Sequence, residues 1–210
     1  MQDVMKYNGE TVLRYRIEYP VFHWPRQATK RINRYYQQLA QFQRHSIQSE
    51  LYCQAVRQYR YAIKNDLPMP VYEVQIDCVV TDQTECSASL YMERYEFTGG
   101  AHGNTLRTSQ TWNVPQAFRL SLGQILRYGD PKHYLLEHIQ SQIAKNPDNY
   151  FDNGSMLAVK TFNPNQFYCT PQGLVIYYQP YDIAPHSSGV PEFLIPYSES
   201  VCDPQQLCAV

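Results

Sequence analysis

The chain has 210 residues, of which 43% are hydrophobic and 18% are charged, and its formal net charge is −1. This length and this apolar fraction predict a globular domain, and they exclude a multi-domain assembly and a disordered chain. No stretch approaches about 18 consecutive apolar residues, which excludes a membrane-spanning helix. The N-terminus lacks the charged-then-apolar layout of a signal peptide, so we expect a cytoplasmic location if Met1 is the native start.

The N-terminal third predicts a strand followed by a long helix. Thr11–Tyr19 alternates apolar and charged residues, which is typical of a half-buried strand. Pro25 suits a first helical turn, and Arg26–Asp66 contains neither Gly nor Pro. The apolar stripe of this helix changes phase along the chain, so we expect a break near His45–Ser49. The first part of that stripe comprises Ala28, Ile32, Tyr35, Tyr36, Leu39 and Phe42.

The rest of the chain predicts strands, a helix and more strands. A period of two and intervening turns indicate antiparallel strands, and Lys132–Lys145 reads as an amphipathic helix. These elements predict an α+β fold: an antiparallel sheet covered by one long or broken N-terminal helix and a second, shorter helix. A C-terminal tail without any period is expected to be frayed. The expected strands are Tyr72–Val80, Cys86–Phe97, Thr105–Val114, Phe167–Cys169, Leu174–Tyr178 and Phe193–Tyr197.

The run from Gly99 to Asn104 is the most unusual local feature of the sequence. Its three glycines free the backbone for positive φ angles and for close approach to a neighbour, so we expect a shaped loop. A phosphate-binding loop is excluded because a strand-like segment follows, where such loops open a helix. His102 has two interpretations: it is a general base or ligand, or its ring bonds a backbone carbonyl and pins the loop.

Other patterns give no catalytic residue, metal site or cofactor. The six histidines are scattered, and no Gly-x-Ser-x-Gly motif occurs. Glu93 and Glu96 are three positions apart, which sends them to opposite faces of a strand. The 19 tyrosines suit a protein-recognition face, a sugar-stacking platform or ordinary filling of a sheet edge.

The six cysteines leave the redox state open. Without a Cys-x-x-Cys spacing, one interpretation is a set of reduced, partly buried thiols. The other is a Cys78–Cys86 link across a hairpin or a Cys202–Cys208 link in the tail, which would indicate an oxidising compartment.

Charge is distributed unevenly along the chain. Residues 1–66 carry a balance of +6 and residues 67–210 a balance of −7. One interpretation is that basic helices lie across an acidic sheet and partly neutralise it. The alternative is a nucleic-acid site at Arg26, Lys30, Arg31 and Arg34, but no recognition motif accompanies this cluster, so we expect no nucleic acid as a partner.

Several separated motifs occur in an order that resembles a known bacterial family. The chain is similar to the extracytoplasmic module of RsiV-type lysozyme-sensing anti-sigma factors and of PdaC-type peptidoglycan deacetylases, from roughly Val12 to Ser198. The motifs are the run Gly99–Asn104, Phe167-Tyr168, Gly173-Leu174, Pro180–Pro185, Gly189 and Ile195–Tyr197.

The resemblance implies a single α+β domain over residues 9–200, with a PdaC-like half at roughly 9–105, an RsiV-like half at roughly 106–200 and a tail at 201–210. It also implies an extracytoplasmic location and a wall-associated partner, which is lysozyme in the anti-sigma branch. The deacetylase chemistry belongs to another domain of those proteins, so no catalytic residues transfer.

The preferred hypothesis is therefore a non-enzymatic binding module of the cell envelope that recognises a lysozyme-like protein or peptidoglycan. The alternative is a hydrolase acting on cell-wall glycans. The sequence leaves the oligomeric state open. The residues expected to form the binding surface are Gly99, Gly100, His102, Gly103 and Asn104, with Tyr181 and Pro185.

Overall fold

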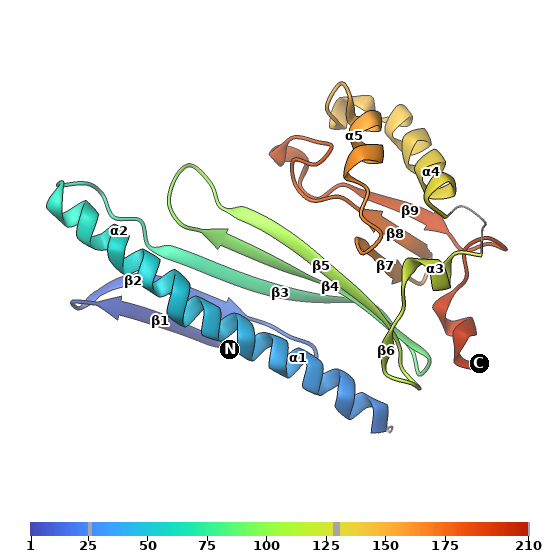
Figure 1. Cartoon of the computed structure of the whole chain (residues 1–210), viewed down its shortest axis with the longest axis horizontal. Coiled ribbons are helices and arrows are strands. Elements are labelled where there is room, and N and C mark those ends of the chain that lie inside the picture. The colour runs from blue at the N-terminus through green and yellow to red at the C-terminus, as the bar shows by residue number, and fades with distance from the viewer. Residues whose placement is uncertain (25–26, 128–130, 210) are drawn as a thin grey trace. The chain divides into compact units, whose positions relative to one another are not determined.

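The structure is a computed structural model that describes residues 1–24, 27–127 and 131–209, apart from the side chains of residues 131, 208 and 209. The expected helix start at Pro25 and the cation Arg26 lie outside this part of the chain. A six-stranded sheet and a separate three-stranded sheet combine with helices, which confirms the α+β class (Figure 1).

The residues form two compact units, each built from several segments of the chain. Unit 1 consists of Met1–His23, Lys30–Cys78 and Met92–Leu106. Unit 2 consists of Trp24–Thr29, Val79–Tyr91 and Arg107–Val210.

The strands follow the order β1-β2-β3-β4-β5-β6 in the larger sheet and β7-β8-β9 in the smaller one. Their bounds are β1 Gln2–Tyr7, β2 Glu10–Ile17, β3 Tyr72–Gln83, β4 Ser87–Phe97, β5 Asn104–Asn113, β6 Phe118–Arg119, β7 Phe167–Thr170, β8 Gly173–Tyr177 and β9 Glu192–Pro196. The helices are α1 Gln27–Ser46, η1 Ile47–Leu51, α2 Tyr52–Lys64, α3 Leu122–Ile125, α4 Pro131–Lys145, η2 Pro147–Asn149, α5 Gly154–Thr161, η3 His186–Ser188 and η4 Pro204–Ala209.

Strand pairing in unit 1 is mixed. β2 pairs with β3 in parallel, because the long helix between them carries the chain back to the same end of the sheet. β1 pairs with β2 in antiparallel fashion through a turn at Asn8 (φ 51°) and Gly9 (φ 86°). Two successive residues with positive φ match the hairpin turn that an Asn-Gly pair favours.

The long helix is continuous from Gln27 to Lys64. Where the sequence predicts a break, the structure has one π-helical segment, η1, whose i→i+5 bonds accommodate an extra residue. The segment corrects the phase of the apolar stripe, so buried side chains continue on one face of the helix. Phe42 was expected in the stripe, but it is 68% exposed. The buried residues of the helix in unit 1 are Ile32, Tyr36, Ala40, Ile47, Leu51, Ala55 and Ala62.

The helix covers one face of the sheet in unit 1. α2 packs on β2, and the side-chain amide of Gln48 donates to the hydroxyl of Tyr15 over 2.9 Å. The buried residues of the two strands alternate, with Tyr15 and Ile17 on β2 and Val74 and Ile76 on β3. These side chains and the buried face of the helix form the interior of unit 1.

The opposite face of the same strands carries the charges. On β2 and β3, Arg16 and Asp77 alternate with the buried positions, and the Arg16 guanidinium lies 2.9 Å from Glu18 and 2.7 Å from Asp77. The expectation that the basic helices neutralise an acidic sheet is therefore wrong for these residues. The pleat turns the carboxylate of Asp77 away from the helix, and a cation on the neighbouring strand pairs with it.

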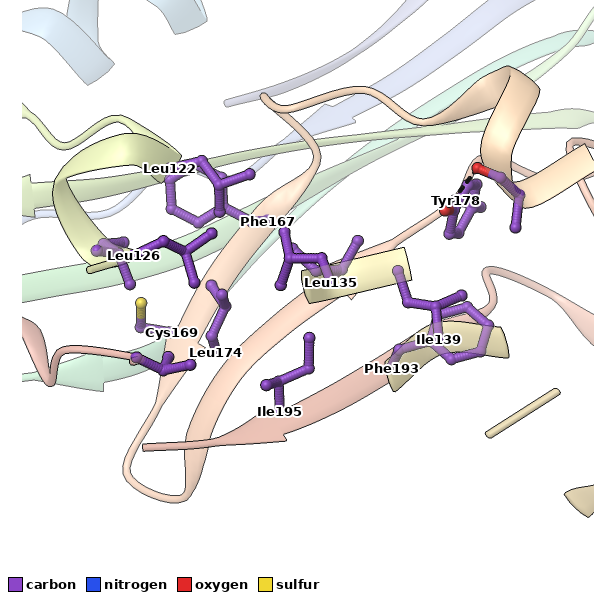
Figure 2. Packing of buried hydrophobic residues seen from close by; sticks show 14 of the residues in the cluster. Leu122, Leu126, Leu135, Ile139, Phe167, Cys169, Leu174, Tyr178, Phe193 and Ile195 are labelled. Atoms are coloured by element: carbon purple, nitrogen blue, oxygen red, sulfur yellow. Dashed lines mark hydrogen bonds between the residues drawn. The ribbon is translucent and has the colours of Figure 1, made fainter. Parts of the chain in front are cut away.

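Unit 2 has its main core between the three-stranded sheet and helices α3, α4 and α5 (Figure 2). Every residue of β8 is buried, which fits a central strand covered on both faces. The hydroxyl of Tyr178 donates to the carbonyl of Ala158 over 2.9 Å, so a polar group in this core has its partner. The second face carries a smaller cluster of Tyr168, Val175 and Tyr177.

The C-terminal segment is more ordered than its sequence predicts. Val201 forms a bridge with Leu126, and Val201 and Cys202 are both buried. A 3₁₀ helix follows at Pro204–Ala209. The expectation of a frayed tail is therefore wrong, because the apolar side chains of Val201 and Leu207 pack in the core of unit 2.

Single-residue deletions test the role of the π segment. Deletion of Ser49 removes the extra residue and leaves a regular α-helix in which the apolar stripe is still aligned. We therefore expect the free energy of unfolding to fall by no more than roughly 1 kcal/mol and the Tm to fall by less than about 4 °C. Deletion of Gln38 rotates every later residue by about 100° and moves the stripe off the core, so the cooperative transition should be lost. Thermal unfolding followed by circular dichroism measures both, and equal losses would contradict this role.

Gly173 provides a test of the packing in unit 2. A Cβ at this position would lie 2.3 Å from the carbonyl oxygen of Ile195, which is backbone and has little freedom to move. We expect Gly173→Ala to destabilise the protein by about 2 kcal/mol and to lower the Tm by about 6 °C. Gly123→Ala is the control because no atom lies within 4 Å of the added Cβ. An unchanged Tm for Gly173→Ala in a thermal melt would show that β8 and β9 do not approach this closely.

Candidate functional site

The glycine run forms the connection between β4 and β5 in unit 1. Gly99 has φ +104° and Gly100 has φ +98°, a backbone region that residues other than glycine rarely adopt. A Cβ on Gly99 would lie 3.1 Å from the Pro70 ring, so the chain also passes close to a neighbour. The expectation of a shaped loop is confirmed by these backbone angles.

Tyr95 and His102 hold the second half of this loop. The ring of Tyr95 lies across the backbone of Gly103, where a Cβ would stand only 2.4 Å from the ring atom Cε2. His102 Nδ1 lies 2.9 Å from the carbonyl oxygen of Gly103. Because a carbonyl oxygen only accepts, Nδ1 is the protonated nitrogen, and His102 donates to its neighbour. This contact matches the interpretation in which the His102 ring pins the loop.

Several side chains of this loop remain exposed while the backbone is held. His102, Asn104 and Tyr95 are exposed, whereas Gly103 is buried beneath the Tyr95 ring. We call this region the glycine-loop surface; it consists of Tyr95, Gly99, Gly100, His102, Gly103 and Asn104. Tyr95 is the member that the sequence analysis missed, and its spacing from the glycine run carries no signal for the contact.

Tyr181 and Pro185 lie in unit 2, in the connection between β8 and β9. Tyr181 is exposed with φ 69°, a left-handed angle that is uncommon for a bulky residue. Its ring centroid lies 5.5 Å from that of His186. The backbone N–H of Gln179 donates to Asp182 over 2.9 Å, and burial raises the pKa of that carboxyl. The connection thus holds a second exposed aromatic ring in a fixed turn.

Unit 2 also contains a buried cation that the sequence analysis did not identify. Arg107 is 7% exposed, pairs with Glu192, and lies 4.0 Å from the centroid of the Tyr91 ring and 5.6 Å from that of Tyr177. The pairing and the rings compensate for the desolvation of the guanidinium. Burial, followed by the nearby Glu192 carboxylate, raises the pKa of Tyr168, so its hydroxyl stays neutral.

The side chain of Gln179 joins the Arg107 cluster to the backbone. The N–H of Arg107 donates to Gln179 Oε1 over 3.0 Å, and Gln179 Nε2 donates to the Arg107 carbonyl over 2.7 Å. The amide therefore replaces a strand neighbour at this point of β5. The cluster has the geometry of a structural support, with the cation already occupied by residues of its own unit.

The cysteines differ from both predicted pairings. Cys78 and Cys202 are free thiols, as are Cys53 and Cys169, whereas Cys86 is disulfide-bonded. The links Cys78–Cys86 and Cys202–Cys208 are therefore wrong. β3 continues to Gln83 before the chain turns, which leaves Cys78 well within the strand and Cys86 beside the turn. Burial raises the pKa of Cys78 to about 11 and that of Cys169 to about 12, so both stay protonated at neutral pH.

The described part of the chain also bears on three other features that the sequence analysis considered: a metal site, a pair of catalytic carboxylates and a membrane span. No group of three His, Cys, Asp or Glu residues there is arranged to hold a metal ion. Arg94 donates to the carboxylate of Glu96 over 2.6 Å, which engages one member of the Glu93 and Glu96 pair. No helix among the described residues is long and apolar enough to cross a membrane.

Two family descriptions match different parts of the chain. Residues 7–105 match the family described as "Deacetylase PdaC", and residues 124–198 match the family described as "Protein of unknown function (DUF3298)". No curated protein is similar enough to be counted as a relative.

Crystal structures of two DUF3298 family proteins are similar to this chain. The protein from Bacteroides fragilis NCTC 9343 has a TM-score of 0.73 and 20% identity, covering 99% of this chain and 93% of that one, which shows the shared fold. The protein from Pseudomonas aeruginosa PAO1 has a TM-score of 0.50 and 25% identity, covering 70% of this chain and 69% of that one. The chain therefore combines a PdaC-like N-terminal region with a DUF3298 region.

Proposed function

We propose that the protein is a non-enzymatic binding module of the bacterial cell envelope. The observation that carries this proposal is the glycine-loop surface, whose backbone is held in one shape while His102, Asn104 and Tyr95 remain exposed. A loop that is already ordered loses little conformational entropy when it binds, so this arrangement favours recognition of a partner.

The chemistry of Cys86 supports an extracytoplasmic location. A disulfide persists in oxidising compartments and is rare in the bacterial cytosol, and Cys86 is disulfide-bonded. The envelope is the compartment in which the similar RsiV-type and PdaC-type modules occur. This location supports a lysozyme-like protein or peptidoglycan as the partner.

The exposed rings of the two units suit both kinds of partner. Tyr95 in unit 1 and Tyr181 in unit 2 each present an aromatic face with a polar hydroxyl. Such rings are enriched at protein interfaces because they combine apolar area with a hydrogen-bonding group. Tyr181 and Pro185 are proposed as a second contact region of the same module.

Calorimetric titration tests this function with lysozyme and, separately, with soluble peptidoglycan fragments. We expect one of the two to bind, and His102→Ala and Gly103→Ala each to weaken that binding at least about tenfold, or 1.4 kcal/mol. The methyl group of Gly103→Ala displaces the Tyr95 ring, which is the end of a mobile side chain, so the fold should be retained.

His45→Ala is the matched control, since His45 is an exposed histidine of the same unit outside the glycine-loop surface. Its affinity should equal that of the unchanged protein. Heats of dilution alone with both ligands would overturn the proposal. If the protein released reducing sugar from solubilised wall, and Glu93→Gln or His102→Ala abolished this release, the function would be that of a glycan hydrolase instead.

A further inference from the structure

The long helix of unit 1 carries an unusual concentration of positive charge. Between residues 30 and 64 the helix has seven exposed cations and one acidic residue, Glu50. We call this row of cations the cationic ridge. It consists of Lys30, Arg31, Arg34, Arg44, Arg57, Arg60 and Lys64.

The cations of α1 and those of α2 share one side of the helix because of the π segment. If the same sequence formed a regular α-helix through Ile47–Leu51, the cations of α2 would turn away from those of α1, just as the apolar stripe would. In the structure, the buried stripe faces the sheet and all seven cations lie on the exposed side. At 1.5 Å per residue the ridge extends for roughly 50 Å, along the rod formed by α1 and α2 in Figure 1.

The charge of the ridge is not neutralised within the described residues. None of the ion pairs found there involves any of the seven cations. Arg60 instead donates to the hydroxyl of Tyr7 over 2.6 Å, which leaves its positive charge in place. Glu50 accepts from the hydroxyl of Ser46 over 3.2 Å. The ridge therefore keeps its positive charge, which is concentrated at residues 30–44 and 57–64 with Glu50 between the two groups.

Apolar side chains are exposed on the same helix as the cations. Phe42 is 68% exposed, Tyr61 57% and Ile63 66%, because none of the three lies on the buried face of the helix. Aromatic and aliphatic groups beside Lys and Arg are typical of helices that lie at the surface of an anionic membrane. A partner that binds through charge alone would gain no affinity from these three apolar side chains.

We propose that the cationic ridge docks the protein on an anionic phospholipid surface. A straight row of cations about 50 Å long matches a plane of charged headgroups, whereas the backbone of a nucleic-acid duplex curves away from a straight helix within about one turn. Each Lys or Arg near such a surface raises the partition coefficient about fivefold. This inference does not rest on the glycine-loop surface, which contains none of the seven cations.

Vesicle co-sedimentation of the full chain tests the docking. We expect binding to vesicles of equimolar phosphatidylglycerol and phosphatidylcholine and no binding to phosphatidylcholine alone. The triple variant R31Q/R34Q/R44Q should lower the partition coefficient about 100-fold, and Phe42→Ser should lower it about tenfold. Higher salt should weaken binding of the unchanged protein.

The control variant K132Q/K145Q/K160Q removes the same charge from exposed positions of unit 2 and should change the partition coefficient less than twofold. Circular dichroism melts of all variants check that the fold is intact. Equal losses for both triple variants would overturn the proposal, because binding would then follow net charge alone. The proposal would also be overturned if the protein did not bind vesicles but bound a short DNA duplex tightly, and if Phe42→Ser left the DNA affinity unchanged. The partner of the ridge would then be a nucleic acid.

Discussion

The helix from Gln27 to Lys64 buries one face along its whole length because a π segment at Ile47–Leu51 inserts an extra residue into it. An α-helix with apolar residues mostly four apart drifts away from its core, and the wider π turn at Ile47–Leu51 reverses this drift. The interior of unit 1 depends on this correction, since Ile32 before it and Ala62 after it are both buried. The same correction keeps the exposed cations on the opposite side.

Both surfaces proposed for binding are produced by the backbone. In the glycine loop, positive φ angles and the close passage beneath Tyr95 fix the chain, and His102 is displayed as a consequence. On the helix, the π segment sets the direction of side chains nearly 50 Å apart. In unit 2, by contrast, the buried Arg107 is compensated by Glu192 and by Tyr91, so the strongest polar cluster is used for support.

Sequence reasoning identified the features that leave a periodic or compositional signal. The alternation of Tyr72–Val80, the phase change near His45–Ser49 and the glycine run all have such signals, and the structure has a strand, a π segment and a shaped loop there. The sequence analysis does not predict β1, although Asn8-Gly9 is a strong hairpin signal, because most residues of this edge strand are exposed and give no buried face.

Features that depend on distant partners left no such signal. Val201 forms a bridge with Leu126, and the Tyr95 ring covers Gly103. The buried guanidinium of Arg107 forms an ion pair with Glu192, which lies far along the sequence.

Amide hydrogen exchange, resolved along Gln27–Lys64, tests the continuity of the helix most directly. The account predicts slow exchange from Ile32 to Ala62 without interruption, including the amides of Ile47–Leu51, because a π segment keeps its backbone hydrogen bonds. Fast, loop-like exchange at Ile47–Leu51 between two protected segments would show a broken helix. That result would contradict the alignment of the buried stripe and of the cationic ridge together.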